Sequence, residues 1–183
     1  MFNKLTQQIL ILVFTVFVAF KPSDVKAQWN TNTFVNLEIS SLITADMISV
    51  PTSDGKTWIA YYHENSGNYD MRAQLIDENG YKQLGNDGIL VSNQPSGSST
   101  YVFNACVDGA NNLIIGCQDL RNGTLQAVLY KISPAGAQLW GANGVVLGAG
   151  LVPNPAALSN NDIAVTWNDD ASGSLKLQKI TAA

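Results

Sequence analysis

The sequence predicts an all-β fold built from repeated antiparallel strands. The main observation is an internal repeat, because two stretches that begin at Asp54 and Asp108 keep their glycines in register at an offset of 56 residues. The matched pairs are Gly67 and Gly123, Gly80 and Gly136, Gly85 and Gly141, and Gly88 and Gly144. In addition, short apolar or alternating segments end in polar turns that contain glycine, which is typical of strands. Beyond the N-terminus, no segment keeps an apolar i, i+3, i+4, i+7 stripe over about ten residues, which argues against a helical fold.

Each complete repeat is predicted to hold four strands. The expected strands are 47–50, 58–63, 69–76 and 88–91 in the first repeat, 101–107, 113–118, 124–132 and 144–147 in the second, and 155–158, 163–168 and 174–180 in the third. Four strands in about 50 residues is the unit of a β-propeller blade. A β-sandwich of the same strands is the alternative, because alternation alone does not separate sheets that stack from blades that radiate.

About three four-stranded antiparallel blades are expected, over residues 46–92, 100–149 and 153–183. The third copy stops before its glycine-containing last quarter, and the segment 29–39 can be laid on the residues from Trp140 to supply the outer strand. Propellers of a single chain have about four to eight blades. We therefore expect that the sequence is the front part of a longer gene product. The second alternative is that two copies self-associate to complete a ring. An open array with exposed edges is the third alternative.

The first 27 residues are interpreted as a secretory signal peptide. Lys4 gives a basic start, residues 9–20 are apolar except for Thr15, and Ala27 offers a small residue before a cleavage site at Gln28. The apolar run is shorter than the roughly 20 residues that a membrane span needs, so no span is expected after cleavage. An N-terminal anchor is the alternative. The expected location is therefore secreted, periplasmic or at the cell surface.

Charge argues against a nucleic-acid partner. Once Lys4, Lys21, Lys26 and Asp24 are removed with the leader, seven Lys and Arg remain against thirteen Asp and Glu. The few cations are scattered singly, which gives no basic footprint for a phosphate backbone. Length and composition suit one extracellular, β-rich domain over residues 28–183.

The two cysteines are expected to be free. If residues 108–111 form a turn, Cys106 lies opposite Leu113 and Cys117 opposite Val102. An offset of four residues along a strand is about 13 Å, whereas a disulfide needs Cα atoms within about 7 Å. We interpret both cysteines as small buried hydrophobic residues, with a bridge as the alternative.

No motif in the sequence predicts catalysis. His63 is the only histidine and is interpreted as a polar residue at a strand end, with Gln118 and Asn168 as its counterparts. The usual zinc and EF-hand spacings are absent, so neither a metal nor a cofactor is expected. The acids Asp54, Asp70, Asp108 and Asp119, and the pair Asp169 and Asp170, are explained by turns or strand starts. Calcium at the turns of Asp119 and Asp169 is a weaker alternative, and Trp58, Trp140 and Trp167 are expected to pack between blades rather than stack on sugars.

The stretch TSDGKTW at 52–58 is similar to the Asp-box turn of sialidases, but Asp54 stands one residue late. An Asp-box carboxylate must reach back to fixed backbone amides, and a slip of one residue removes this physical basis of the motif. The stretches VDGANNL and SNNDI occupy the same place in the other repeats without Thr-Trp. We therefore interpret 52–58 as a turn between strands.

The stretches GYKQLGNDGILV and GAQLWGANGVVL resemble the propeller repeats of large secreted proteins of Bacteroidetes-type bacteria. The resemblance covers most of residues 28–183. It implies export, commonly by type IX secretion with a separate C-terminal sorting domain, and no such domain follows in this sequence. We expect a secreted, non-catalytic module that binds protein or polysaccharide or plays a structural part. The alternative is a fragment of a glycan-active enzyme whose catalytic residues lie outside this chain.

Overall fold

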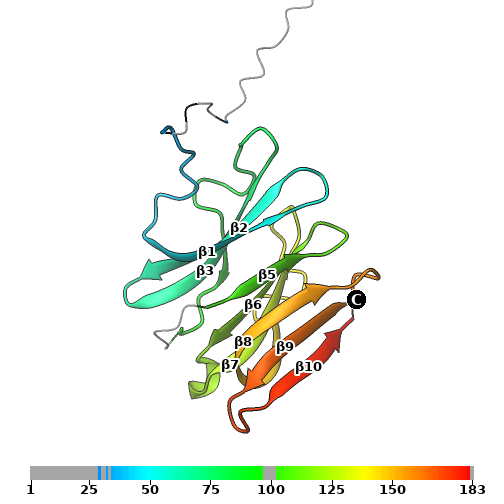
Figure 1. Ribbon diagram of the computed structural model, residues 1–183. Helices are drawn as coiled ribbons and strands as arrows, with labels where there is room; N and C mark the ends of the chain where they lie inside the picture. The colour runs from blue at the N-terminus through cyan, green and yellow to red at the C-terminus, as the bar shows by residue number, and fades with distance from the viewer. Residues whose placement is uncertain (1–28, 30–31, 33, 97–101, 182–183) are drawn as a thin grey trace, which may run out of the picture.

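The computed structural model describes residues 29, 32, 34–96 and 102–181, so the predicted leader lies outside the described residues. These residues form ten strands and one short 3₁₀ turn (Figure 1). The strands are β1 (Thr44–Pro51), β2 (Thr57–Asn65), β3 (Asn68–Ile76), β4 (Ile89–Ser92), β5 (Asn104–Val107), β6 (Leu113–Asp119), β7 (Gln126–Ile132), β8 (Val145–Ala157), β9 (Ile163–Asp169) and β10 (Leu175–Ile180), and the turn η1 (Arg121–Gly123) follows β6.

The strands form two antiparallel sheets. The first has four strands in the order β1-β2-β3-β4, and the second has six in the order β10-β9-β8-β7-β6-β5. Every segment that the sequence assigned to a strand overlaps an observed strand, and the all-β fold of propeller-like antiparallel repeats is confirmed. The number of blades stays a prediction.

The glycine repeat has a physical cause in the backbone. All eight matched glycines have φ between 62° and 89°, a region that other residues rarely adopt. Gly88 and Gly144 have a second reason, because a Cβ would lie 2.2 Å from the carbonyl oxygen of Ala73 in the first case and 2.4 Å from that of Leu129 in the second. Ala73 and Leu129 hold equivalent places in β3 and β7. The fourth strand of each of these two repeats therefore begins where the chain presses against the third strand.

The strand β8 joins two repeats without a break, whereas the sequence predicted separate strands at 144–147 and 155–158. Its first part, 145–149, pairs with β7, and its second part, 150–157, pairs with β9. The register shifts between Leu151 and Asn154, and Val152 lies there with a φ of 51°. The Val152 N–H donates to Oε1 of Gln118 at 2.9 Å, so β6 supports the bend. The fourth strand of the second repeat is thus continuous with the first strand of the third.

The predicted placement of residues 29–39 beside the third repeat differs from the structure. Nε1 of Trp29 donates to the Glu78 carbonyl at 2.9 Å, and the Ser41 N–H donates to Oδ1 of Asp87 at 2.8 Å, so the segment lies against the first sheet (Figure 1). Its described residues contain no strand and do not pair with β10. Within one chain, local hydrogen bonds to the first sheet hold the segment at the opposite end of the array.

Consecutive repeats pack through the faces of their sheets. The first interface joins Trp58, Ala60 and Tyr62 of β2 to Leu113, Ile115 and Cys117 of β6. The second joins Ile114 of β6, with Ala127 and Leu129 of β7, to Ile163, Val165 and Trp167 of β9. The middle repeat therefore buries both faces, and every residue of β6 is buried. Burial on both faces is the arrangement of stacked blades, since each sheet of a two-layer sandwich buries only one.

A hydrogen bond between turns repeats at both interfaces. Oδ1 of Asn111 accepts from the Ser53 N–H at 2.9 Å, and Oδ1 of Asn161 accepts from the Gly109 N–H at 2.9 Å. Asn111 and Asn161 adopt φ of 62° and 67°, which asparagine tolerates better than most residues. We call this bond the turn clasp. The equivalent residue of the first repeat is Gly55, which has no side chain to form it.

Asn111→Gly should destabilise the fold by about 1 kcal/mol, because it removes the clasp amide but keeps a residue that accepts positive φ. Urea unfolding of the purified protein measures the loss. Asn122→Gly is the matched control, since Asn122 has the same φ of 62° but lies in η1, away from both clasps. Equal losses in the two variants would show that the clasp contributes nothing.

Candidate functional site

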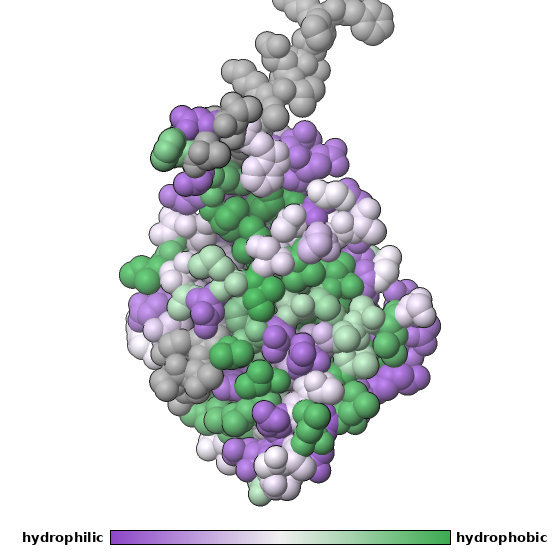
Figure 2. Space-filling view, in the orientation of Figure 1, coloured by the Kyte–Doolittle hydropathy of each residue, from purple (hydrophilic) through white to green (hydrophobic). Residues whose placement is uncertain are grey.

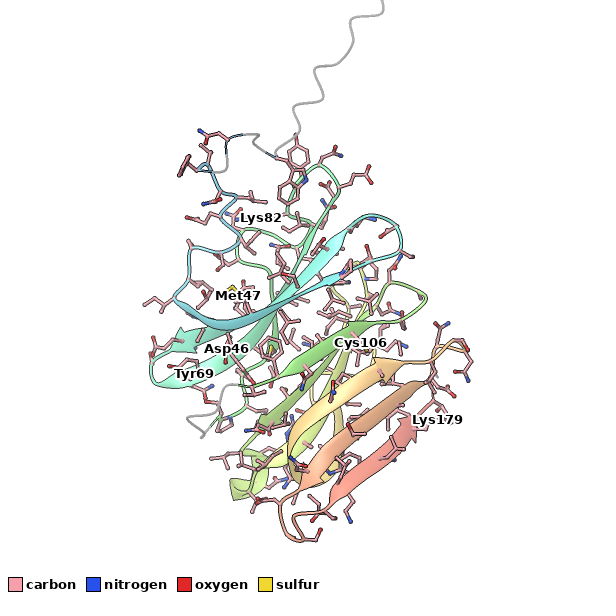
Figure 3. All side chains as sticks on the ribbon, in the orientation of Figure 1. Asp46, Met47, Tyr69, Lys82, Cys106 and Lys179 are labelled. Atoms are coloured by element: carbon pink, nitrogen blue, oxygen red, sulfur yellow. The ribbon has the colours of Figure 1, made fainter. Side chains whose placement is uncertain are left out.

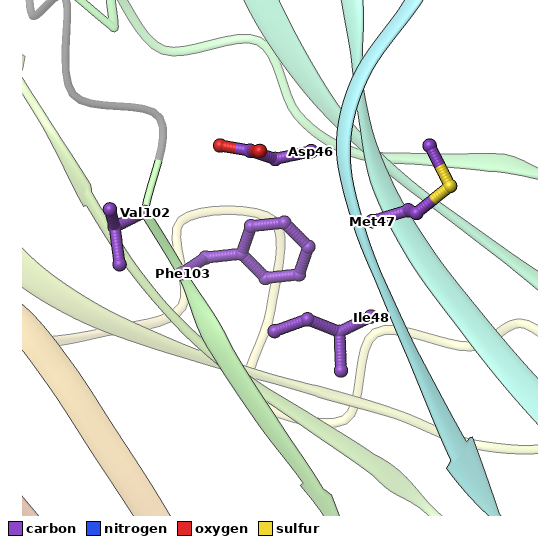
Figure 4. Close-up of a pocket in the computed structure, with 5 residues that line it drawn as sticks. All are labelled: Asp46, Met47, Ile48, Val102 and Phe103. Carbon is purple, nitrogen blue, oxygen red and sulfur yellow. The ribbon is translucent and has the colours of Figure 1, made fainter.

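A hollow of about 210 Å³ lies between β1 and β5, the first strands of the first two repeats (Figure 4). It is lined by Asp46, Met47, Ile48, Val102 and Phe103. Asp46 and Ile48 point toward β5 with Phe103 between them, while Met47 points to the other side of β1 (Figure 4). Phe103 is buried and forms the apolar floor, and Val102 is exposed at the rim.

The backbone presents Asp46 to this hollow. The pairing of β1 with β2 shifts between Ala45 and Met47, so Asp46 is the extra residue of a β-bulge, and it has a φ of 37°. A bulge changes the direction of a side chain and is frequent near binding sites. Within the described residues, the exposed Asp46 carboxylate has no hydrogen-bond or ion-pair partner. It is therefore free to accept hydrogen bonds from a ligand.

Met47 links this hollow to a second one. That second hollow, of about 250 Å³, lies on the outer face of the first sheet between Glu38, Ile39, Ser40, Thr44, Met47, Ile59 and Tyr61. Met47 is 65% exposed, which is high for an apolar side chain (Figure 3). Pockets that enclose a small molecule usually measure about 300–1,000 Å³. Both hollows fit part of a larger ligand better than they fit an enclosed substrate.

The acids singled out in the sequence are held by local groups. Oδ1 of Asp54 accepts from the Thr52 hydroxyl at 2.6 Å, and Oδ2 contacts Nζ of Lys56. These two contacts, Lys56 first, lower the Asp54 pKa to about 2. The 52–58 stretch thus contains a turn, as predicted, and neighbouring side chains hold the Asp54 carboxylate. Asp70 accepts at 2.9 Å from the amides of both Asn65 and Asn68.

Asp119 belongs to a network that joins the first two repeats. Its two oxygens accept from Nε and Nη2 of Arg121, each at 2.7 Å. Arg121 also donates to the Tyr130 hydroxyl at 2.6 Å, and that hydroxyl donates to Oγ of Ser92 in the first repeat at 2.9 Å. Burial is the main cause that raises the Tyr130 pKa. The phenol therefore stays protonated and keeps this donor.

His63 and the turn acids do not form a metal site. Nδ1 of His63 donates to the Ile43 carbonyl at 3.1 Å. The paired register makes Asp119 and Asp169 its counterparts, rather than Gln118 and Asn168 as the sequence suggested. Oδ1 of Asp169 accepts from both N and Oγ of Ser172 at 2.8 Å. Over the described ranges, no three His, Cys, Asp or Glu residues gather to hold a metal ion.

The tryptophans pack between repeats, as predicted. Trp58 is fully buried and donates from Nε1 to the Asn111 carbonyl at 3.0 Å. Trp167 is buried in the second interface, and Trp140 packs against it with Nζ of Lys131 at 5.6 Å from its ring centroid. Trp58 and Trp167 are therefore buried, and Trp140 is half-buried.

Both cysteines are free, as predicted, although the register differs by one residue. Cys106 lies opposite Ile114 rather than Leu113, because the turn takes in Asp108 to Asn112. Cys117 is buried in the first interface and Cys106 is half-buried beside the second, so their side chains lie on opposite faces of the sheet. Burial raises the thiol pKa of Cys106 to about 11 and that of Cys117 to about 12.

Comparison with known proteins gives a distant structural likeness. No protein-family profile and no curated protein sequence matches the chain. A similar solved structure is that of the NanB sialidase from Streptococcus pneumoniae, at 15% sequence identity and a TM-score of 0.43. The match covers 78% of this chain but 23% of that protein. So loose an overlap places no residue of this chain in a site of that enzyme.

The sequence did not indicate the hollow between β1 and β5. The residues around Asp46 resemble an ordinary apolar strand in the sequence, and only the pairing of β1 with β2 reveals the bulge.

No helix in the described part of the chain is long and apolar enough to cross a membrane.

An ion pair between Asp108 and Lys131 is almost fully buried, with Oδ2 and Nζ 3.1 Å apart. Burial opposes the charged form of Asp108, but hydrogen bonds from the side chain and backbone of Asn112, with Lys131 next, outweigh it and lower the Asp108 pKa. Lys131→Met should therefore cost about 3–5 kcal/mol, because it leaves a buried carboxylate without its cation. Lys131→Met combined with Asp108→Asn should cost less than the single change.

The same pair predicts loss of stability in acid. The unfolded pKa of aspartate is about 3.9 and the folded pKa of Asp108 is lower. Its contribution is therefore complete above about pH 4 and is lost as the pH falls through the folded value. Urea unfolding of the parent and double variant across this range measures the difference. If the difference in unfolding free energy between the parent and the double variant stays the same from about pH 6 to about pH 3, the lowered pKa of Asp108 is contradicted.

Thiol titration tests the cysteines. The native protein should react slowly with a thiol reagent, because the thiolate is the reactive form and both pKa values are raised. Unfolding without a reductant should release two reactive thiols per chain. Absence of reaction after unfolding would indicate a disulfide.

Proposed function

We propose that the chain is an exported, non-catalytic module that binds protein or polysaccharide at the cell surface. The observation that carries this proposal is the hollow between β1 and β5, where the Asp46 carboxylate stands beside an apolar floor of Phe103 and Ile48. A carboxylate accepts from sugar hydroxyls or from a cationic side chain, and an apolar floor accepts the carbon face of either ligand. The site thus offers two kinds of contact on a rigid sheet.

The local hydrogen bonding supports a binding role over catalysis. A pair of acids for glycoside hydrolysis must stand free on both sides of a sugar, about 5–10 Å apart. Asp46 is a single free carboxylate at the hollow, while Asp54, Asp70 and Asp119 are held by neighbouring side chains. Export rests on the predicted leader at 1–27, and the resemblance to secreted repeats of Bacteroidetes-type bacteria favours the cell surface.

Affinity electrophoresis tests the proposal with named soluble polysaccharides: xylan, laminarin, dextran and pectin. At least one should retard the protein, and Asp46→Asn should weaken the retardation about tenfold or more, because hydrogen bonds to a charged group contribute about 1.5–3 kcal/mol. Asparagine tolerates the positive φ of residue 46, so the fold should be kept. The thermal midpoint of Asp46→Asn checks this.

Asp170→Asn is the matched control, because it makes the same change of charge at an exposed turn of the third repeat. It should bind as the parent does. Equal weakening in both variants would place the ligand elsewhere, and lack of retardation by all four polysaccharides would exclude each of them as the ligand. Release of reducing ends from any of them would replace the binding role with the enzymatic alternative.

A further inference from the structure

The third repeat leaves a sheet face uncovered that the other two repeats bury. Leu175 and Leu177 of β10 are 72% and 71% exposed. The paired register makes them equivalent to Met71 and Ala73 in β3 and to Ala127 and Leu129 in β7. All four of those residues are 1% exposed or less. The same positions of the repeat are thus buried in the first two repeats and exposed in the third.

Two neighbours bury the equivalent residues in the earlier repeats. A fourth strand pairs with the third, as β4 does with residues 71–73 and β8 with residues 126–129. The face of the next repeat then covers the sheet. In the described structure β10 has neither neighbour, and it forms the edge of the second sheet (Figure 1). An edge of this kind is a template for a further strand.

The segment that precedes β1 holds the place of a fourth strand. In the other repeats, the fourth strand comes directly before the first strand of the next repeat, as the continuous strand β8 shows. Counting back from the register of β1 and β2 places such a strand at 39–43 if the connection follows β8. It places the strand at about 33–36 if the connection follows β4 and β5.

This head segment, residues 34–43, carries exposed apolar side chains. Phe34 is 92% exposed and Ile43 is 71% exposed. The segment lies at the end of the array opposite β10 (Figure 1), so a single chain with this structure does not bring them together. One end of the array thus has a non-strand segment in the sequence position of a fourth strand, and the other end has a sheet edge with no strand beside it.

We propose that a second copy of this chain docks head to tail, with its head segment added to β10 and its first repeat over Leu175 and Leu177. Charge does not select this order, because Lys176 and Lys179 of β10 already pair within the chain with Asp169 and Asp162, at 3.8 Å and 3.0 Å. Lys179 stands at the exposed edge (Figure 3). The contact continues the same face-to-face packing that joins the repeats within the chain, and it does not depend on the ligand of the proposed function.

The joint differs from the internal interfaces in one respect. Gly55 replaces the clasp asparagine in the first repeat, so the turn clasp does not form between copies. The joint therefore depends on strand pairing and on apolar contact. On the face drawn in Figure 2, hydrophobic patches lie among hydrophilic ones. We expect reversible association that increases with concentration. A head-to-tail contact closes into a ring if its rotation allows and otherwise extends.

Two variants that block opposite ends test the proposal by sedimentation velocity. The tail variant carries Leu175→Glu and Leu177→Glu, and the head variant carries Phe34→Asp and Ile43→Asp. All four side chains are exposed in the single chain, so the fold should be kept. The parent should associate as concentration rises, whereas each variant alone should stay monomeric, with a dissociation constant raised about tenfold or more.

Mixing the two variants distinguishes this contact from others. The tail variant keeps an intact head and the head variant an intact tail, so the mixture should form one-to-one dimers and nothing larger. Leu139→Glu, at a leucine exposed elsewhere, is the control and should associate as the parent does.

Three outcomes would overturn the proposal. A monomeric parent at all concentrations would exclude a second copy as the occupant of this face. A head variant that still dimerises would indicate face-to-face pairing of two β10 strands. A mixture that stays monomeric would show that the two ends do not recognise each other.

Discussion

Burial of the middle repeat on both faces is the constraint on which the rest of the structure depends. Each repeat supplies one face of apolar side chains to its neighbour, and β6 receives contacts from both sides. Because no repeat covers both of its own faces, stability comes from the contact between consecutive repeats, as in other repeat proteins. The turn clasps and the network from Asp119 to Ser92 then fix how neighbouring repeats are oriented.

The repeat pattern predicted the strands and the glycine turns because both arise from local chemistry. The positive φ of Gly88 and Gly144 is a local feature that favours glycine, so the register of the repeat was visible in the sequence. The continuity of β8 and the position of the N-terminal segment depend on contacts between distant residues, such as Gln118 with Val152 and Trp29 with Glu78. Those contacts leave no periodic signal.

The candidate site was hidden from the sequence for a similar reason. The bulge at Asp46 exists only relative to the register of β2, and Phe103 reaches the hollow only because the first two repeats pack together. In contrast, Asp54 lies in a turn as predicted, while Asp119 and Asp169 are the last residues of β6 and β9 instead of turn residues. Asp54 and Asp169 still bond groups two or three residues away, and such bonds need no tertiary contact. Short-range chemistry was readable, and convergence of distant strands was not.

The unbroken course of β8 has a consequence for how the molecule comes apart. The second and third repeats share the strand β8, which is hydrogen-bonded to both β7 and β9. Local unfolding of either repeat therefore disturbs hydrogen bonds of the other, and the two should open as a single cooperative unit. The first and second repeats are joined instead by the separate strands β4 and β5. Thermal fluctuations should therefore divide the chain between these two strands, with the first repeat as the independent part.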